Sequence, residues 1–211
     1  GTGTITSKNV ESNKTVSVGT LTLADGSNGG LAANYTLSGG THQLTVTQRP
    51  LNSSGSKAYD ANTDALANAI TLSNLAGGET LVHSGTASTS SANVGSYTIN
   101  NLAGIGISNG TGSASNYTLT GGTHSFTINK RVVSLSGGSR QYNGSATAIA
   151  ADLPTINNLV GSETLTLSGN GVVENANVGD NKPLTNLSGL TLQNGSNAVS
   201  YTHLRAHETV L

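Results

Sequence analysis

Two glutamates are the acidic residues with the clearest potential for catalysis. Glu79 and Glu163 each stand in the pattern Gly-x-Glu-Thr-Leu, which therefore occurs twice in the chain. A glycosidase would need a second carboxylate about 5–9 Å away. The nearest candidate for Glu79 is Asp60, but the residue that corresponds to Asp60 near Glu163 is Asn143. Because an amide cannot act as a general acid, we interpret both glutamates as solvated turn residues and predict no enzymatic activity.

Two histidines occupy another recurring position. His42 and His124 each follow Gly-Gly-Thr. A metal site or a catalytic base would require a second His or a carboxylate at ligand spacing, and none lies nearby in the sequence. A partner distant in the sequence stays open. We expect each histidine to begin a strand, and we expect no cofactor.

One loop and several asparagines are candidates for calcium binding and glycosylation. The loop that begins at Asp25 is rich in Gly and Asn, but an EF-hand would need Glu at its twelfth position, where Thr36 stands. Calcium binding is therefore a minor alternative. Glycans on a surface protein could attach at Asn-x-Ser/Thr sites. These are Asn13, Asn34, Asn52, Asn109, Asn116, Asn143, Asn186 and Asn194. Asn34 and Asn116 belong to a recurring motif, so we expect both to be partly buried.

The composition excludes several classes of protein. Lys and Arg number 9 against 10 Asp and Glu, which leaves no basic patch for nucleic acid. Cysteine is absent, so disulfides and thiol chemistry are excluded. No apolar run is long enough to span a membrane. The chain starts without Met or a signal peptide, and we expect it to come from the middle of a longer protein.

A long internal repeat organises the sequence. Asn34-Tyr35-Thr36-Leu37 recurs as Asn116-Tyr117-Thr118-Leu119, and Gly39-Gly40-Thr41-His42 recurs as Gly121-Gly122-Thr123-His124. Three further landmarks recur at almost the same interval: Tyr59-Asp60 with Tyr142-Asn143, Asn74-Leu75 with Asn158-Leu159, and Asn93-Val94-Gly95 with Asn177-Val178-Gly179. The interval of roughly 82–84 residues is too long for one coil of a β-solenoid and suits a small domain.

The landmarks predict four segments. Residues 1–49 form the C-terminal part of a first repeat, 50–131 a complete repeat, 132–198 a truncated third repeat, and 199–211 a tail. We expect the change from one repeat to the next near residues 48–56 and 132–140, with each repeat contacting mainly its neighbours.

The apolar pattern inside each repeat is typical of strands. Apolar and polar residues alternate at residues 16–23, 44–46, 126–128, 165–167 and 190–192. Alternation with period two predicts strands with one buried face. Residues 64–70 and 145–153 could form one or two helical turns. The fold class is therefore all-β, with tandem small domains that are sandwich-like or, as an alternative, β-grasp-like.

Short motifs give the chain a family resemblance. Tyr59-Asp60-Ala61 and Tyr142-Asn143-Gly144 resemble the opening of the YDG repeats of secreted bacterial proteins. So do Asn93-Val94-Gly95, Asn177-Val178-Gly179, Asn116-Tyr117-Thr118-Leu119 and the closing residues 126–131. Such repeats occur in tandem in large exoproteins that resemble filamentous haemagglutinin, mostly of Gram-negative bacteria. The resemblance implies β-rich modules that are secreted or lie on the cell surface, and it implies no catalytic residues.

Individual motif residues have independent physical interpretations. Asp60 and Asn143 each follow a tyrosine and can accept a bond from the backbone two residues on, forming an Asx-turn. The Asn and Gly of Asn93-Val94-Gly95 suit a turn between strands. We expect Tyr59, Tyr117 and Tyr142 to lie in the core or at its rim, each with its hydroxyl near a partner.

The last thirteen residues differ from the rest of the chain. Residues 199–209 resemble the translation of a transposon-type sequencing adapter, and they bring two His, an Arg and a Glu into a sequence poor in them. We interpret the tail as non-native and expect it to pack poorly. The alternative is a diverged natural end, because Tyr201-Thr202 echoes the Asn-Tyr-Thr-Leu motif.

Three functions compete. The leading hypothesis is a repeated stalk module of an adhesin-like protein, whose partners are neighbouring repeats, with weak multivalent adhesion. The second is a module that binds glycan or host protein through loops at the repeat ends. The third is a polysaccharide-acting enzyme, which the repetition or replacement of every acidic landmark disfavours.

Overall fold

The computed structural model describes residues 1–99, 102–136 and 138–195, and its regular elements are strands and short 3-10 turns. The first strands are β1 (Thr4–Ile5), β2 (Glu11–Ser17), β3 (Gln43–Val46), β4 (Arg49–Pro50), β5 (Asn52–Ala58), β6 (Asp64–Leu66), β7 (Ile70–Ser73), β8 (Leu81–Ser88) and β9 (Gly95–Thr98). They continue with β10 (Ile105–Asn109), β11 (Tyr117–Thr118), β12 (His124–Asn129), β13 (Ser134–Ser136), β14 (Thr147–Ile149), β15 (Thr155–Asn157), β16 (Leu165–Val173), β17 (Leu184–Asn186) and β18 (Leu190–Asn194). The predicted all-β class, built from several small sheets, is confirmed.

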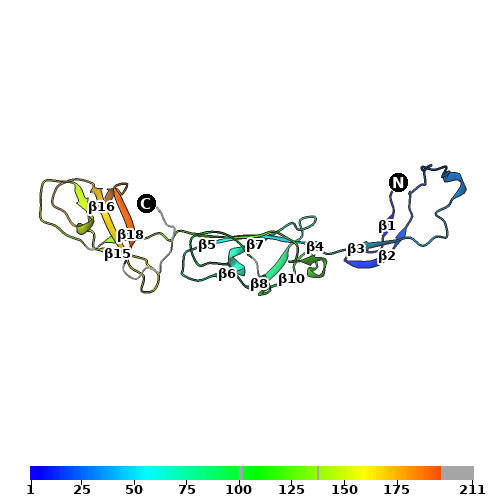
Figure 1. Ribbon diagram of the computed structural model, residues 1–211, viewed down its shortest axis with the longest axis horizontal. Helices are drawn as coiled ribbons and strands as arrows, with labels where there is room; N and C mark the ends of the chain where they lie inside the picture. The colour runs from blue at the N-terminus through cyan, green and yellow to red at the C-terminus, as the bar shows by residue number, and fades with distance from the viewer. Residues whose placement is uncertain (100–101, 137, 196–211) are drawn as a thin grey trace. The chain divides into compact units, whose positions relative to one another are not determined.

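The chain, whose strands are labelled in Figure 1, divides into two compact units by the contacts within it. Unit 1 comprises residues 1–57, 63–91 and 95–128. Unit 2 comprises residues 58–62 and 92–94, together with the described residues from 129 onward. Two short landmarks of the second repeat, the Tyr59 turn and Asn93-Val94, therefore belong to the same unit as the third repeat.

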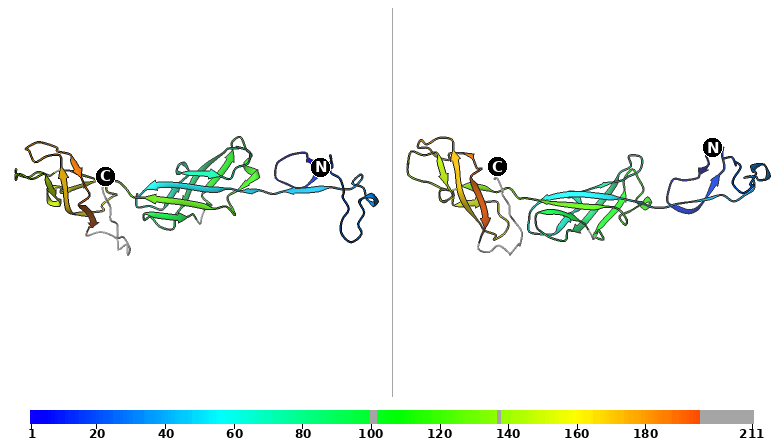
Figure 2. Two further views of the ribbon diagram at one scale, coloured as in Figure 1. Left: turned by 90° about the horizontal axis from the view of Figure 1, so that it is seen from above. Right: turned by 45° about the horizontal axis from the view of Figure 1, so that its top comes forward.

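The second repeat contains two larger sheets, which Figure 2 shows from two further sides, and a short parallel pair of β4 with β11. One has the order β7-β5-β12-β9 and the other β10-β8-β6. Buried apolar side chains come from both: Leu51, Ile70, Phe126 and Ile128 on or beside the first sheet, and Ala65, Ala87 and Ile105 on the second. A core supplied by two sheets is the arrangement of a sandwich.

The first long strand of this repeat lies beside its last strand. Ser53 N–H donates to the Thr123 carbonyl at 2.9 Å, where β5 meets β12. A Cβ placed on Gly55 would lie 2.2 Å from the Ala69 carbonyl oxygen and 2.8 Å from ring carbons of Phe126. Glycine at this position lets the fully buried Phe126 ring lie across β5.

Unit 2 has a smaller set of sheets. β13 pairs with β15, with Leu135 opposite Ile156. β16 is the central strand of the other sheet and pairs antiparallel with β14, β17 and β18. Leu190 and Ala148 are buried there. The tail at residues 199–211 lies outside the described residues.

The alternating pattern predicted most strands but not all. Strands form at residues 43–46, 126–128, 165–167 and 190–192. The strand predicted at residues 16–23 forms only at its start, where residues 16 and 17 end β2, and is wrong for residues 21–23. Residues 21–23 correspond to residues of β10 in the second repeat, where β10 pairs with β8. The first repeat contains counterparts of only the last residues of β8, so most of this partner strand is missing. Without that pairing Leu21 is 41% exposed, whereas the corresponding Ile105 is 6% exposed.

Helical structure is limited to single 3-10 turns of three residues. They are η1 (Ala32–Asn34), η2 (Ala67–Ala69), η3 (Ala114–Asn116) and η4 (Ala150–Asp152). η2 and η4 fall inside the two stretches predicted to form helical turns. The β-grasp-like alternative stays a prediction beside the sandwich, because the first and last long strands of the repeat are central neighbours in the sheet β7-β5-β12-β9. None of the described helices could cross a bilayer.

The turn after each tyrosine landmark has a left-handed residue. Asp60 Oδ1 accepts from Asn62 N–H at 3.2 Å, and Asn143 Oδ1 accepts from Ser145 N–H at 3.1 Å, so both Asx-turns form. The residue between has φ 62° at Ala61 and φ 75° at the corresponding Gly144. Only glycine adopts this conformation without a steric cost from Cβ, so Ala61 is strained.

We expect Ala61→Gly to stabilise unit 2 by about 0.5–1.5 kcal/mol, because glycine removes the Cβ strain at the cost of a more flexible unfolded chain. Gly144→Ala should destabilise unit 2 by a similar amount. Native-state hydrogen exchange of β16 amides in the full chain measures both changes. A neutral Gly144→Ala variant would contradict the assigned strain.

Candidate functional site

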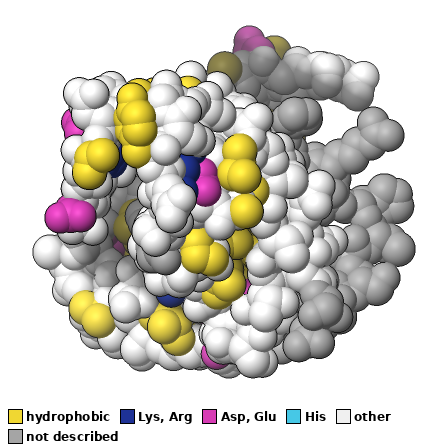
Figure 3. Space-filling view, turned by 90° about the vertical axis from the view of Figure 1, so that its left-hand side faces the viewer, with side chains coloured by type: hydrophobic (Ala, Val, Ile, Leu, Met, Phe, Trp, Pro, Cys, Tyr) yellow, Lys and Arg dark blue, Asp and Glu magenta, His cyan; other side chains and the backbone are white. Residues whose placement is uncertain are grey.

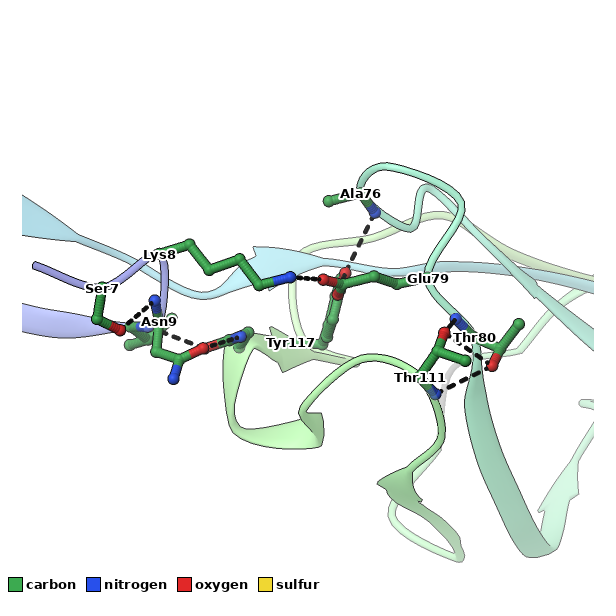
Figure 4. A network of polar contacts seen from close by, with 10 residues as sticks. Ser7, Lys8, Asn9, Ala76, Glu79, Thr80, Thr111 and Tyr117 are labelled. Atoms are coloured by element: carbon green, nitrogen blue, oxygen red, sulfur yellow. Dashed lines mark hydrogen bonds and ion pairs between the residues drawn. The ribbon is translucent and has the colours of Figure 1, made fainter. Parts of the chain in front are cut away.

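Glu79 stands at the centre of a polar network in unit 1 (Figure 4). Tyr117 Oη donates to Glu79 Oε2 at 2.6 Å, and Lys8 Nζ forms an ion pair with Oε1. Ala76 N–H donates to Tyr117 Oη at 3.2 Å. The Glu79 side chain is only 14% exposed, so its interpretation as a solvated turn residue is wrong. β11 places the buried Tyr117 ring where its hydroxyl reaches the carboxylate.

The hydrogen bonds of this network favour the charged forms of Glu79 and Lys8. The hydrogen bond from Lys8 holds the pKa of the Glu79 carboxyl below its ordinary value, and the hydrogen bond from Tyr117 adds to this effect. The hydrogen bond to Glu79, followed by its negative charge, raises the pKa of Lys8. A general acid needs a raised carboxyl pKa, so the shift at Glu79 is in the opposite direction.

Glu163 occupies the corresponding position in unit 2 and receives a different donor. The hydroxyl of Tyr59 donates to Glu163 Oε1. Asp60, the carboxylate considered as a partner for Glu79, belongs to unit 2, whereas Glu79 belongs to unit 1.

The histidine rings bond to carbonyls in their own repeats. Nε2 of His42 lies 2.8 Å from the Leu37 carbonyl, and Nε2 of His124 lies 2.8 Å from the Leu119 carbonyl. A carbonyl only accepts, so Nε2 carries the proton, and Nδ1 of His124 accepts from the Ser53 hydroxyl at 3.0 Å. His124 begins β12, and His42 directly precedes β3.

A third histidine, which the sequence analysis did not single out, is bonded in the same way. Nε2 of His83 lies 3.0 Å from the Ala67 carbonyl and 2.9 Å from the Ile70 carbonyl. It lines a shallow surface depression beside η2. Its donor nitrogen is therefore already occupied by the protein.

The calcium alternative is weakened by a comparison between repeats. Asp25 Oδ1 accepts from Ala32 N–H at 2.7 Å, and Asn109 Oδ1 accepts from Ala114 N–H at 2.8 Å. An amide and a carboxylate thus make the same contact before the same 3-10 turn, so the negative charge is not required. Within the described ranges, no three His, Asp or Glu residues form a group that could hold a metal.

A pair of asparagines joins the first repeat to the second within unit 1. Asn116 Oδ1 accepts from Val10 N–H at 2.8 Å, and Asn116 Nδ2 donates to Asn9 Oδ1 at 3.0 Å. Asn9-Val10 lies one repeat interval before Asn93-Val94 and is the same landmark. We call this two-residue segment the Asn–Val turn. The first copy does not stand out in the sequence, because Glu11 takes the place that Gly95 has in the second.

The Asn–Val turn of the first repeat is held in place by its own neighbours. Asn9 N–H donates to Ser7 Oγ at 3.1 Å. Lys14 Nζ donates to the Ser7 carbonyl at 2.9 Å and pairs with Glu11 at 3.1 Å. The Lys14 side chain is 1% exposed, so this contact is part of the folded structure. The turn is therefore preformed for its contact with Asn116.

The comparisons with known proteins agree with these repeats. The YDG domain family model matches residues 40–125 and 129–209. The chain belongs to the YDG domain family. Neither a curated protein nor a solved structure matches it. The second match extends past the described residues into the segment predicted to be non-native.

The same arginine–asparagine contact stands where the chain enters the second repeat and where it enters the third. Arg49 Nε donates to the Asn74 carbonyl at 2.6 Å, and Nη2 donates to Asn74 Oδ1 at 2.7 Å. Arg131 bonds to Asn158 through the same atoms, at 2.7 Å in each case. Both asparagines have left-handed φ angles, 66° and 70°, and each amide nitrogen donates to the carbonyl after the arginine. This contact fixes the path of the chain as it enters a YDG repeat.

Two expectations for the YDG landmarks are wrong. Tyr142 is 67% exposed, whereas Tyr59 is half-buried and Tyr117 is buried. Asn34 is exposed, whereas Asn116 is half-buried. Both half-buried residues contact an adjacent repeat within their unit, which explains the difference.

We expect Tyr117→Phe to destabilise unit 1 by about 1–3 kcal/mol, because it removes a donor to a charged group and an acceptor for the Ala76 amide. The matched control is Tyr35→Phe, because Tyr35 is the first-repeat counterpart and is 69% exposed. Hydrogen exchange at the buried Phe126 amide measures the stability of unit 1. Equal effects of the two substitutions would contradict the assigned role of the hydroxyl.

The Lys8–Glu79 pair should respond to pH at both extremes. The lowered pKa of Glu79 means that its contribution is present above the ordinary glutamate pKa and is lost as the pH falls through the lowered value. The raised pKa of Lys8 means that its contribution is lost only as the pH rises through the raised value. Carboxyl NMR titration of Glu79 in the native chain and in Lys8→Ala tests this. The Glu79 pKa should rise in the variant, and an unchanged pKa would disprove the coupling.

Proposed function

We propose that this chain is a repeated structural module, a spacer in a large secreted or cell-surface bacterial protein, with weak adhesion at each repeat. The contact of Asn116 with the Asn–Val turn is the observation that carries this proposal. It uses a recurring polar landmark to join one repeat to the next. A protein built as a series of joined modules needs such contacts at every interval.

The remaining polar landmarks support the same function. Glu79 and Glu163 accept hydrogen bonds from tyrosines, and His42 and His124 donate to carbonyls. An enzyme would instead present an acid, a base or a nucleophile toward a cleft. These side chains are occupied by the protein itself, so a role in holding the structure accounts for them better than catalysis does.

Adhesion by such a module would depend on copy number. The chain carries few charges and a surface of Ser, Thr, Asn and Gly, which offers little long-range attraction to a charged partner. Weak contacts repeated along a chain can still add up through effective concentration. The alternative function, a module that binds glycan or host protein through its loops, would instead produce measurable affinity in one copy.

Display of the full chain as a monomer and in many copies on a bead tests the proposal. Binding to glycan arrays and host cells should be weak for the monomer and should rise steeply with copy number. Saturable binding of one glycan by the monomer would favour the alternative function. Hydrolysis of a polysaccharide that Glu79→Gln or Glu163→Gln abolishes would favour an enzyme and overturn the proposal.

A further inference from the structure

The third repeat carries an Asn–Val turn with the same construction as that of the first. Asn177 N–H donates to Asn175 Oδ1 at 3.0 Å, as Asn9 N–H donates to Ser7 Oγ. Lys182 Nζ donates to the Asn175 carbonyl at 2.8 Å, as Lys14 Nζ donates to the Ser7 carbonyl. Each of these residues occupies the same place in its repeat as its counterpart. The turn at Asn177-Val178 is thus preformed in the same way.

The valine of the Asn–Val turn differs in exposure from one repeat to another. Val10 is half-buried where its turn meets Asn116, and Val94, in the second repeat, is 36% exposed. Val178 is 87% exposed. A preformed turn that presents an exposed valine has the features of a contact surface whose partner is not among the described residues.

Tyr142 gives a second, independent observation on the same repeat. Its counterpart Tyr59 is half-buried and donates to Glu163, whereas Tyr142 is 67% exposed. The third repeat has Ala176 at the position of Lys8, so the lysine that pairs with Glu79 has no equivalent there. Two positions, those of Lys8 and Tyr59, supply a donor to a glutamate elsewhere in the chain. The third repeat keeps only the tyrosine, Tyr142.

The surface around these residues is suited to a protein partner. Figure 3 shows separate hydrophobic side chains, with a few basic and acidic ones, on the face of unit 2 turned to the viewer. The large exposed apolar side chains of this unit are Val94, Val132, Tyr142, Ile149, Val172 and Val178. Tyr142 and Val178 belong to the third repeat and are the equivalents of residues that join repeats elsewhere in the chain.

We propose that Tyr142 and the Asn177-Val178 turn form a docking surface for a further YDG repeat linked in the same polypeptide. The asparagine of its Asn-Tyr-Thr-Leu motif accepts from the Val178 amide and donates to Asn177, as Asn116 does with the first repeat. The glutamate of its Gly-x-Glu-Thr-Leu motif accepts from the Tyr142 hydroxyl, as Glu163 does from Tyr59. This inference rests on the proposed function as a tandem spacer.

A second intact copy of the chain is a poorer occupant. Among its described residues, Glu79 already binds Lys8 and Tyr117, and Glu163 already binds Tyr59. Asn116 already holds the first Asn–Val turn. The docking surface needs a repeat whose motif asparagine and glutamate are not already bound to another repeat. A repeat that follows the third one directly in the same polypeptide meets this condition.

An extended chain tests the proposal. Residues 196–211 are replaced by a copy of residues 111–131, which completes the third repeat, and a copy of residues 50–131 follows. The Val178 amide should exchange fast in the original chain and about tenfold or more slowly in the extended chain. The Val10 amide, which already donates to Asn116, is the internal control and should be protected in both.

Two variants of the extended chain identify the contact. Asn→Ala at the added copy of Asn116 should abolish the protection of Val178 and leave that of Val10 unchanged. Tyr142→Phe should lower the unfolding midpoint of the added repeat, whereas the same substitution in the original chain should have no effect. Protection of Val178 that survives the asparagine variant would overturn the assigned contact.

The remaining outcomes also decide the proposal. An unprotected Val178 amide beside a folded added repeat would overturn it. The proposal would also be overturned if the added repeat stayed unfolded after the third repeat but folded when inserted after residue 131, because the third repeat would then not support it. Protection of Val178 in the original chain that rises with protein concentration would identify a second copy as the occupant instead. None of these readouts measures adhesion, so failure of the docking surface and failure of the proposed function are distinguishable.

Discussion

The structure depends on the pairing of the first long strand of a YDG repeat with its last. β5 and β12 are neighbours in the sheet, yet about 70 residues separate them in the sequence. Phe126 becomes fully buried only because it lies across Gly55 on the first strand. In the first repeat, where β3 pairs with β2 in the sheet β1-β2-β3, the corresponding Leu44 is 50% exposed. The same apolar position is therefore exposed in the first repeat, which lacks the long first strand, and buried in the second, where that strand is present.

The contacts between repeats compensate for a core with few aromatic side chains. The chain has a single Phe and no Trp, so large apolar contacts between repeats are difficult to build. Amide pairs, a tyrosine–carboxylate bond and the arginine–asparagine contact occupy these positions instead. Hydrogen bonds of this kind contribute about 0.5–1.5 kcal/mol each, and more when one partner is charged. Their directionality also defines which residues of successive repeats meet.

The sequence predicted the features that depend on local residues. The all-β class followed from alternation, the tandem repeats from recurrence, and the YDG family from the resemblance of short motifs. The Asx-turns of Asp60 and Asn143 followed from side-chain chemistry alone. Features that depend on another repeat were missed. Glu79 pairs with Lys8 and accepts a hydrogen bond from Tyr117, and both partners are far away in the sequence. The exposure of Tyr142 likewise depends on which repeat lies beside it, and no local pattern records that.

The donors to the two glutamates show how such contacts tolerate sequence change. Lys8 reaches Glu79, whereas Ala92 stands at the corresponding place in the second repeat and Tyr59 reaches Glu163 instead. The acceptor is retained and the donor comes from a different loop. A catalytic carboxylate would not allow this exchange, because its partner sets its pKa and its proton transfer. A structural acceptor requires only that some donor reach it, since both glutamates are partly shielded from solvent and gain from a donor that replaces water. The recurrence of glutamate beside a changing set of donors is therefore better explained by the contact between repeats than by chemistry.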